Sequence, residues 1–335
     1  MERSAMLKVV LVGLLVASFV LPVQVSAQSR SRRGGLYGDW QIKMRFGENE
    51  LESILAFSRN QDGYTGQWIS FWGMNELKDV KFEDNKLSFT QVMRFGDQER
   101  TSKFTGTIEQ GELSGLLIGD ERETEIKGKR APRPPRGVGS WEMTIKAGER
   151  EYTGILTITA DQEGNLSGTW KSSRGESKLS DVMYENRKLT FKRVTEREGN
   201  RRERTFEGTL GSTSLEGVFK SDSGESAATG TRVGASVIGT WNLDVESERR
   251  TYKQRLRVNP DLSALYGSTV IKKVNLDGDK VSFKYVLPFG DQEIEVGFEG
   301  KIADSKLTGE VKTSRGTSKV TGTRRASRRP GASQR

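Results

Sequence analysis

The sequence contains no cysteine and no histidine. Without cysteine, the chain can form no disulfide, no thiol nucleophile and no thiolate metal site. Without histidine, it has no Ser-His-Asp or Cys-His catalytic group and no histidine-ligated zinc. Only carboxylates, lysines, tyrosines and hydroxyl groups remain for catalysis. These absences favour a non-enzymatic protein that carries no metal and no other cofactor, and whose stability comes from packing.

Long apolar runs are also scarce, and the one that stands out is at the N-terminus. A short basic start precedes VVLVGLLVASFVLPV, and Val25 and Ala27 then occupy the −3 and −1 positions of a signal-peptidase site. The run is shorter than the roughly 20 residues of a membrane-spanning helix. We predict a signal peptide over residues 1–27, cleaved after Ala27, and an exported protein, periplasmic or extracellular, with no integral membrane span. An uncleaved anchor is the alternative.

The rest of the sequence is dominated by a pattern that occurs three times. Trp40, Trp141 and Trp241 begin similar segments at intervals of 101 and 100 residues. FGDQE occurs in the first and third of these repeats, at Phe95 and Phe289. Each repeat also has two phenylalanines fifteen residues apart, a glycine two residues after the second, and a closing Gly-x-Arg: Phe89, Phe104, Gly106 and Arg130; Phe191, Phe206, Gly208 and Arg232; Phe283, Phe298, Gly300 and Arg324.

Within each repeat, apolar and polar residues alternate, as in WQIKMRF, which indicates β-strands with one buried face. About eight such runs, separated by turn signals such as DQEGN and ENRK, fit into each repeat. Eight antiparallel strands can close into a barrel and so remove their exposed edges. We predict an all-β chain of three tandem eight-stranded antiparallel up-and-down β-barrels, with an open sandwich as the alternative. The predicted segments are a basic N-terminal segment 28–37, repeat one 38–130, a Pro/Arg linker 131–138, repeat two 139–232, a linker 233–238, repeat three 239–324 and a basic tail 325–335.

The Gly-x-Trp of the first strand and the arginine at the end of the last strand resemble the calycin superfamily of lipocalins, avidins and small bacterial metalloprotease inhibitors. The resemblance implies a small β-barrel in which the arginine packs across the tryptophan. It does not extend to biotin binding, because the later tryptophans of the avidin pocket have no counterpart here. The closing pairs that it implies are Trp40 with Arg130, Trp141 with Arg232, and Trp241 with Arg324.

An eight-stranded barrel is either filled by side chains or holds one small ligand. Trp68 and Trp170, on the third strand of repeats one and two, are candidates to line a pocket mouth, but Thr269 replaces them in repeat three. We expect a filled core, with these tryptophans as plain core or rim residues. A lipocalin-like carrier of a small ligand is the alternative.

Paired carboxylates are the remaining route to catalysis, as in glycoside hydrolysis. Asp79 and Asp181 occupy equivalent positions, yet Lys273 takes that place in repeat three. We interpret both aspartates as turn or strand-end residues. FGDQE is interpreted as a hairpin turn shared by descent, with a shared contact site as the alternative.

The basic residues are concentrated outside the repeats. The segments QSRSRRGG, KGKRAPRPPRG and RRASRRPGASQR contain thirteen basic residues and no acidic one, which exceeds the formal net charge of +9 of the whole chain. The remaining sequence is therefore mildly acidic. Arg130, Arg133 and Arg136 of the first linker are candidate contacts for an anionic polysaccharide or another anionic envelope surface. A solvated linker without a ligand is the alternative.

These observations favour an exported, monomeric, non-enzymatic binding or scaffold protein of the cell envelope. One alternative is an inhibitor whose partner is a secreted hydrolase. In that case the resemblance would assign the inhibitory role to the segment QSRSRRGGLYGD of this chain. The other is a carboxylate-dependent hydrolase, which needs a cleft between repeats.

Overall fold

The computed structural model describes residues 35–46, 49–95, 98–120, 122–197, 200–248, 250–289 and 292–326. The chain divides into two units, residues 1–33 and 34–335, and all described residues belong to the second unit. The predicted signal peptide over 1–27 lies outside the described residues, as do residues 28–34 and 327–335 of the basic segments. Among the described residues, no helix has the length and hydropathy needed to cross a membrane.

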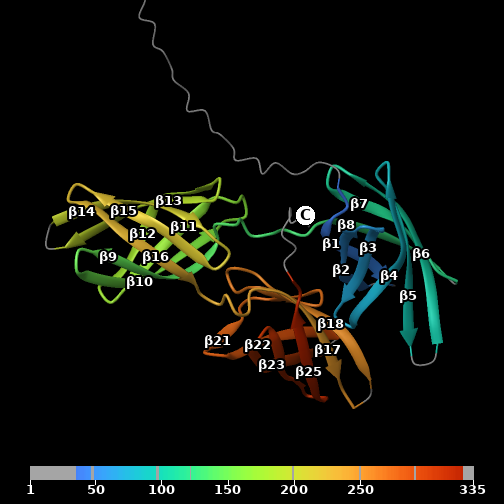
Figure 1. Ribbon diagram of the computed structural model, residues 1–335. Coiled ribbons are helices and arrows are strands. Elements are labelled where there is room, and N and C mark those ends of the chain that lie inside the picture. Colours follow the sequence, from blue (N-terminus) through green and yellow to red (C-terminus); the bar gives the residue numbers. More distant parts are fainter. Residues whose placement is uncertain are drawn as a thin grey trace, which may run out of the picture. The chain divides into compact units, whose positions relative to one another are not determined.

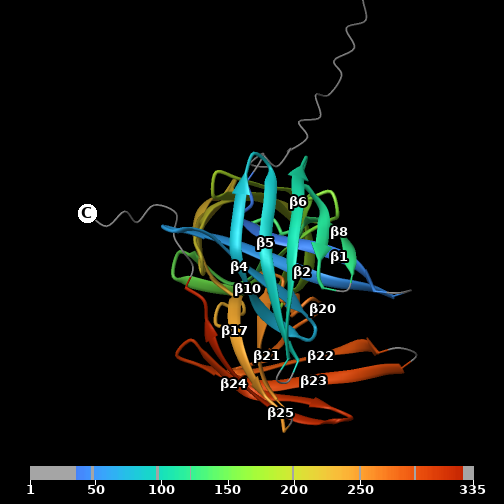
Figure 2. The same cartoon turned by 90° about the vertical axis from the view of Figure 1, so that its right-hand side faces the viewer.

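The described residues form an all-β structure, which confirms the predicted fold class (Figure 1). Repeat one is a closed antiparallel barrel in which each strand pairs with the next and β1 pairs with β8. Figure 2 shows two of its neighbouring strands, β5 and β6, running side by side. The strands are β1 (Gly38–Phe46), β2 (Asn49–Asn60), β3 (Gly63–Ser70), β4 (Gly73–Glu83), β5 (Lys86–Phe95), β6 (Gln98–Glu109), β7 (Glu112–Ile118) and β8 (Glu123–Arg130).

Repeat two is a second closed barrel with the same strand order, and β9 pairs with β16 to close it. The strands are β9 (Gly139–Ala147), β10 (Arg150–Ala160), β11 (Leu166–Ser172), β12 (Gly175–Glu185), β13 (Lys188–Arg197), β14 (Asn200–Leu210), β15 (Ser214–Ser221) and β16 (Gly224–Arg232).

Repeat three follows the predicted order of tandem antiparallel strands, but it differs from a closed eight-stranded barrel, because its strands form a nine-stranded sheet that runs from β20 to β21. The fourth strand is split into two short pieces that do not pair with each other. The register corrects the predicted equivalence of Thr269 with Trp68 and Trp170, because Tyr266 lies opposite Leu256 as Trp170 lies opposite Leu156. The chain is shorter here, since eight residues separate Tyr266 from Val274 where twelve separate Trp170 from Val182. The strands are β17 (Gly239–Glu246), β18 (Thr251–Val258), β19 (Ala264–Tyr266), β20 (Thr269–Ile271), β21 (Asn275–Asp277), β22 (Lys280–Phe289), β23 (Gln292–Ala303), β24 (Lys306–Thr313) and β25 (Gly316–Arg324).

The repeated phenylalanines and glycines form one packing motif in each repeat. In repeat two, the rings of Phe191 and Phe206 stack with their centroids 4.7 Å apart. The ring of Phe206 lies over Gly208, where an added Cβ would come within 2.5 Å of the ring and 2.9 Å of the Glu216 carbonyl oxygen. No larger residue fits there without moving the neighbouring strand. The equivalent stacks, Phe89 with Phe104 and Phe283 with Phe298, have centroid distances of 4.7 and 4.8 Å.

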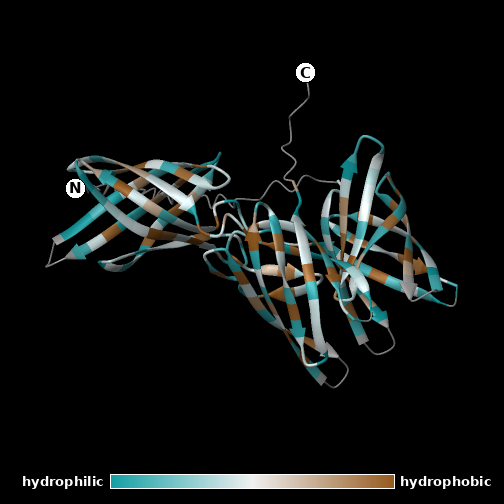
Figure 3. Cartoon of the chain, turned by 60° about the horizontal axis from the view of Figure 1, so that its bottom comes forward, coloured by the Kyte–Doolittle hydropathy of each residue, from teal (hydrophilic) through white to brown (hydrophobic). Residues whose placement is uncertain are grey.

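The predicted alternation of apolar and polar residues corresponds to the two faces of each barrel wall. Figure 3 shows hydrophobic and hydrophilic bands that alternate along the strands. In β9 the residues from Trp141 to Ile145 are alternately buried and less buried. The buried residues of each repeat form a cluster of its own, so each repeat has a separate hydrophobic core.

Asp79 and Asp181 lie at β-bulges rather than at strand ends. The pairing register shifts between Lys78 and Lys81 in β4, and at the equivalent place in β12. The two aspartates have positive φ values of 54° and 52°, a conformation that aspartate tolerates better than most residues. Their carboxylates are engaged by the next strand: Thr90 donates a hydrogen bond to Asp79 at 3.4 Å, and Asp181 pairs with Lys192 at 2.9 Å. Both aspartates therefore have a structural role in bending the wall.

Repeats one and three contact each other through a buried ion-pair network. Arg255 donates hydrogen bonds to both carboxylate oxygens of Asp39, each at 3.1 Å, and Arg257 donates one at 2.6 Å. Only 3% of the Arg255 side chain is exposed. Burial raises the pKa of Asp39, but Arg255 and Arg257 lower it by more, so the pKa lies below its usual value. Beside the network, Leu265 packs on an apolar cluster of repeat one that includes Ile69.

Candidate functional site

Each arginine at the end of a repeat lies over the tryptophan at its start. The guanidinium carbon is 4.6 Å from the indole centroid for Arg130 and Trp40, 4.4 Å for Arg232 and Trp141, and 5.4 Å for Arg324 and Trp241. In each repeat the two residues are also cross-strand partners in the register of the first and last strands. The arginine thus contacts the tryptophan in each of the three pairs.

These arginines also hold the chain segment that enters each repeat. Arg130 donates hydrogen bonds to the carbonyl oxygens of Gly35 and Tyr37, the latter at 2.6 Å. Arg232 donates to the carbonyl oxygen of Val138 at 3.0 Å. Burial lowers the pKa of both guanidiniums, and Arg133 contributes a smaller lowering at Arg130. Arg130 therefore belongs to the barrel and is already engaged, unlike the other linker arginines.

The described end of QSRSRRGGLYGD is attached to the same end of repeat one. Leu36 is fully buried, and its carbonyl oxygen accepts a hydrogen bond from the indole nitrogen of Trp40 at 2.9 Å. Tyr37 next to it is 59% exposed. The part of this segment that is available as a free inhibitory strand would have to lie before Gly35, outside the described residues.

Arg133 and Arg136 are exposed, as Arg130 is. They lie between β8 and β9 in a stretch that contains Pro132, Pro134 and Pro135 and forms no strand. Proline fixes the backbone φ and removes hydrogen-bond donors, which stiffens this connection. The guanidinium of Arg133 lies beside the start of repeat one, 3.2 Å from the position of a Cβ added to Gly38. The basic residues of the segment are exposed along its whole length, from Lys127 to Arg136.

Trp68 and Trp170, the predicted pocket-mouth tryptophans, lie in the barrel cores. They are 4% and 1% exposed. Trp68 packs edge-on against Phe89 with ring centroids 6.3 Å apart, and Trp170 against Phe219 at 5.6 Å. A Cβ added to Gly154 would lie 2.7 Å from the Trp170 indole, so this ring rests directly on the neighbouring strand β10. The two rings fill the interior at the level where a small ligand would otherwise bind.

The sequence analysis missed a group of arginines at the end of repeat two that carries the β9–β10, β11–β12 and β13–β14 hairpins, which we call the hairpin end. Arg193 is half-buried, its guanidinium carbon lies 4.7 Å from the Trp170 ring centroid, and its Nε donates to the hydroxyl of Ser177 at 3.2 Å. Burial, then the charges of Arg204 and Arg174, lower the pKa of Arg193 to about 10. The sequence did contain a signal for this position. Arg193 follows the core Phe191 by two residues, so its side chain lies on the same inward face of the strand.

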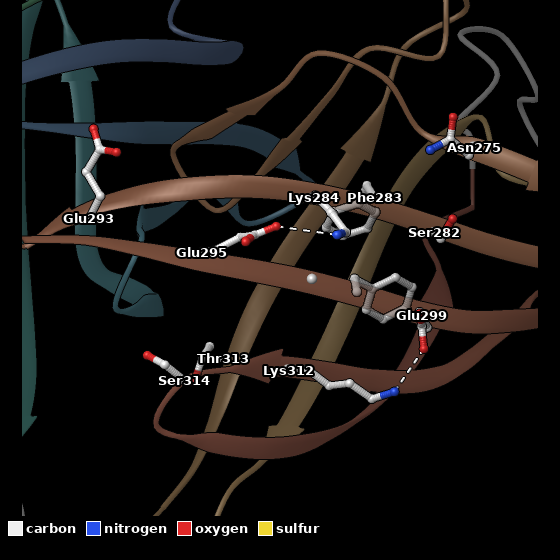
Figure 4. A pocket seen from close by; sticks show the side chains of 12 residues that line it. Asn275, Ser282, Phe283, Lys284, Glu293, Glu295, Glu299, Lys312, Thr313 and Ser314 are labelled. Atoms are coloured by element: carbon white, nitrogen blue, oxygen red, sulfur yellow. Dashed lines mark hydrogen bonds and ion pairs between the residues drawn. The ribbon is translucent and has the colours of Figure 1, made fainter.

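A shallow groove lies on the outer face of β22, β23 and β24 in repeat three, with a volume of ≈ 670 Å³ (Figure 4). Its floor is open at Gly297, where an added Cβ would meet no atom within 4 Å. The lysines that line it are paired with glutamates, Lys284 with Glu295 at 3.4 Å and Lys312 with Glu299 at 2.9 Å. A hydrogen bond from Lys312 lowers the pKa of Glu299. Two of the three lining glutamates are thus paired with the lysines, and the third, Glu293, is exposed. The ion pairs are exposed as well, and exposed pairs contribute little to binding or stability.

The two copies of FGDQE join equivalent strands. Phe95 pairs with Gln98 at the end of the β5–β6 hairpin, and Phe289 with Gln292 at the end of the β22–β23 hairpin. The Gly-Asp dipeptides between them, 96–97 and 290–291, lie outside the described residues. The register places both copies at the connection between the fifth and sixth strands of a repeat.

No family model matches this chain, and no curated protein matches it. Among solved structures, the chain is similar to a candidate outer membrane protein of Bacteroides fragilis, with 14% identity and a TM-score of 0.24 over 58% of this chain and 97% of that one. A variant of transferrin binding protein B of Haemophilus parasuis has 10% identity and a TM-score of 0.19 over 87% and 76%. A porin-like protein of Bacteroides vulgatus has 11% identity and a TM-score of 0.19 over 86% and 98%. Likenesses this remote support no argument about function, which therefore rests on the residues of the chain itself.

Proposed function

We propose that this chain is an exported, non-enzymatic binding protein of the cell envelope that holds an acidic polysaccharide through its exposed basic segments. The observation that carries the proposal is the exposure of Arg133 and Arg136 on a proline-stiffened connection. Arg130 is exposed too, but it donates hydrogen bonds to the carbonyl oxygens of Gly35 and Tyr37. A row of exposed guanidiniums without acidic neighbours attracts an anionic polymer.

The interiors of the barrels are filled by side chains, which supports ligand binding on the outer surface. Trp68 and Trp170 occupy the space that a carrier would keep for its ligand. Asp79 and Asp181, the carboxylates that occur at equivalent positions, bend strands and contact the neighbouring strand. Binding on the basic surface segments is consistent with both observations.

The test measures binding of the mature chain to an immobilised polyuronate as salt rises. We expect binding to weaken steeply with salt, because charges farther apart than the Debye length of about 10 Å at 0.1 M are screened. The variant Arg133→Ser/Arg136→Ser, with and without deletion of residues 327–335, should bind about tenfold more weakly or worse at low salt. Arg130 and Arg324 stay unchanged in these variants, because they stack on Trp40 and Trp241.

The control variant Arg187→Asn/Arg201→Ser removes the same number of charges as the linker variant, from two exposed positions of repeat two. Arg187 has a φ of 69°, which asparagine tolerates. The control should bind as the wild type does. Equal losses in the two variants would show that net charge alone drives binding, and salt-independent binding by the linker variant would contradict the proposal.

A further inference from the structure

The arginines at the hairpin end of repeat two form a cluster of like charge, which we call the arginine cluster: Arg174, Arg193 and Arg204. Arg193 and Arg204 are directly opposite each other on β13 and β14. Arg174, in the β11–β12 hairpin, lies over Tyr152 with its guanidinium carbon 5.1 Å from the ring centroid. The charged groups that act on Arg193 are the two other guanidiniums. Like charges directly opposite each other in a sheet are destabilising, so Arg204 opposite Arg193 opposes folding, although Arg193 itself packs on Trp170.

The same positions of the other repeats are occupied by uncharged residues. The position two residues after the first core phenylalanine is Gln91 in repeat one and Tyr285 in repeat three, where repeat two has Arg193. The position two residues before the second core phenylalanine is Ser102 and Val296, where repeat two has Arg204. The barrel frame therefore does not require an arginine at either place.

In repeat three, tyrosines occupy the part of the core that is equivalent to the surroundings of Arg193 in repeat two. Tyr266 lies 5.6 Å from Tyr285 between ring centroids, and burial raises the pKa of Tyr266 well above its usual value. Repeat two instead presents half-buried Arg193 and Arg204 and exposed Arg174 to solvent above the Trp170 ring. A partly desolvated guanidinium gains more from an anion than a fully hydrated one does, and its fork suits the oxygens of a sulfate, phosphate or carboxylate.

We propose that the arginine cluster of repeat two is a discrete binding site for one oxyanion group carried on an acidic polysaccharide. The proposal deepens the proposed function and rests on it, since it assigns a second contact on the same ligand, separate from the linker. Arg193 is positioned by Trp170 and by the hydroxyl of Ser177. Arg204 and Arg174 supply the further charge that a group with several anionic oxygens needs.

The experiment titrates the full mature chain with a sulfated tetrasaccharide by calorimetry. We expect one site per chain. The variant Arg193→Gln/Arg204→Ser introduces the residues of repeat one, Gln91 and Ser102, which the same barrel frame already accommodates. Its affinity should fall about tenfold or more, because hydrogen bonds to charged groups are lost. The control Arg187→Asn/Arg201→Ser, with the same change in charge, should keep the wild-type affinity.

A second variant, Arg193→Lys, keeps the charge and removes the guanidinium fork, and should bind severalfold more weakly at unchanged unfolding temperature. Unchanged affinity in both Arg193 variants would overturn the site. Inorganic sulfate that binds as tightly as the tetrasaccharide would overturn the polysaccharide assignment in favour of a free anion. Binding only to vesicles of anionic lipid would overturn it as well.

The linker variant Arg133→Ser/Arg136→Ser separates the two proposals. It should keep the wild-type affinity for the short tetrasaccharide, because the arginine cluster is unchanged. If no form of the protein binds the long polymer, the proposed function is wrong. If the polymer binds and Arg193→Gln/Arg204→Ser binds the tetrasaccharide like the wild type, only the site is wrong.

Discussion

Repeat two and repeat three share the same core contacts and differ in whether their sheet closes. Both have the stacked phenylalanine pair, at 4.7 and 4.8 Å, and both have an arginine over the first tryptophan. Repeat two has a continuous fourth strand and closes, while the fourth strand of repeat three is split and its sheet stays open. The frame therefore depends on the core motif and the Trp/Arg pair, and tolerates the loss of one continuous strand.

The two repeats also differ in how they relate to the rest of the chain. Strand β18 of repeat three lies against β4 of repeat one, and Arg255 on β18 is buried against Asp39. The described core clusters of repeats two and three contain no residue of another repeat. The difference lies outside the cores, in the ion pair of Arg255 and in Leu265, which packs on an apolar cluster of repeat one. We conclude that repeat two is a self-sufficient barrel, whereas repeat three uses repeat one to cover one of its faces.

The largest expected effect separates the two repeats as isolated fragments. A fragment from Val138 to Val233 should fold alone and unfold cooperatively, since it retains a complete core and a closed sheet. A fragment over residues 235–326 should be much less stable, because it exposes Leu265 and loses the partner of Arg255. Thermal unfolding followed by circular dichroism measures both. Equal stability of the two fragments, or a disordered repeat two, would contradict the comparison.

The second effect concerns the contact on which repeat three depends. Asp39→Asn leaves Arg255 buried without its charged partner and should cost about 3–5 kcal/mol of unfolding free energy. Because the folded pKa of Asp39 is lowered, its stabilisation is complete above its usual value of 3.8 and is lost as pH falls through the folded pKa. The wild type and the variant should thus converge below about pH 4. A difference in stability that is the same at pH 3 and pH 7 would show that the ion pair is not its source.

The smallest effect concerns the feature that both repeats share. Arg232→Ala removes the stacking on Trp141 and the hydrogen bond to Val138, and should cost about 1–3 kcal/mol. The emission of Trp141 should shift at the same time. Arg201→Ala, at an exposed position of the same repeat, should change stability by less than about 0.5 kcal/mol. Similar effects of the two substitutions would mean that the arginine does not close the barrel.

Strands were predictable because their signal is local. Alternation over a few residues determines which face of a strand is buried, and repetition at intervals of 101 and 100 residues showed which positions are equivalent. The missed bulges show where this signal ends. Asp79 and Asp181 were interpreted as turn or strand-end residues, because a single residue with positive φ inside a strand leaves the pattern on either side unchanged.

The arginine cluster was missed for a different reason. Arg193 and Arg204 belong to a stretch dense in charge, KRVTEREGNRRER, which is typical of an exposed hairpin. Only the position of each residue relative to Phe191 and Phe206 indicates an inward direction. That indication becomes firm when the register places the two arginines opposite each other beside Trp170.

By itself, the sequence determined the all-β class, the threefold repeat, and the phenylalanines, glycines and tryptophans that build each core, because these depend on residue type and spacing along one strand or hairpin. Only the tertiary structure decided that the sheet of repeat three stays open, that Asp39 meets Arg255 across 216 residues, and that three guanidiniums gather at one end of repeat two. Such contacts depend on which strands and repeats pack against each other. A pattern within one strand or hairpin does not determine which distant charged residue will lie beside it.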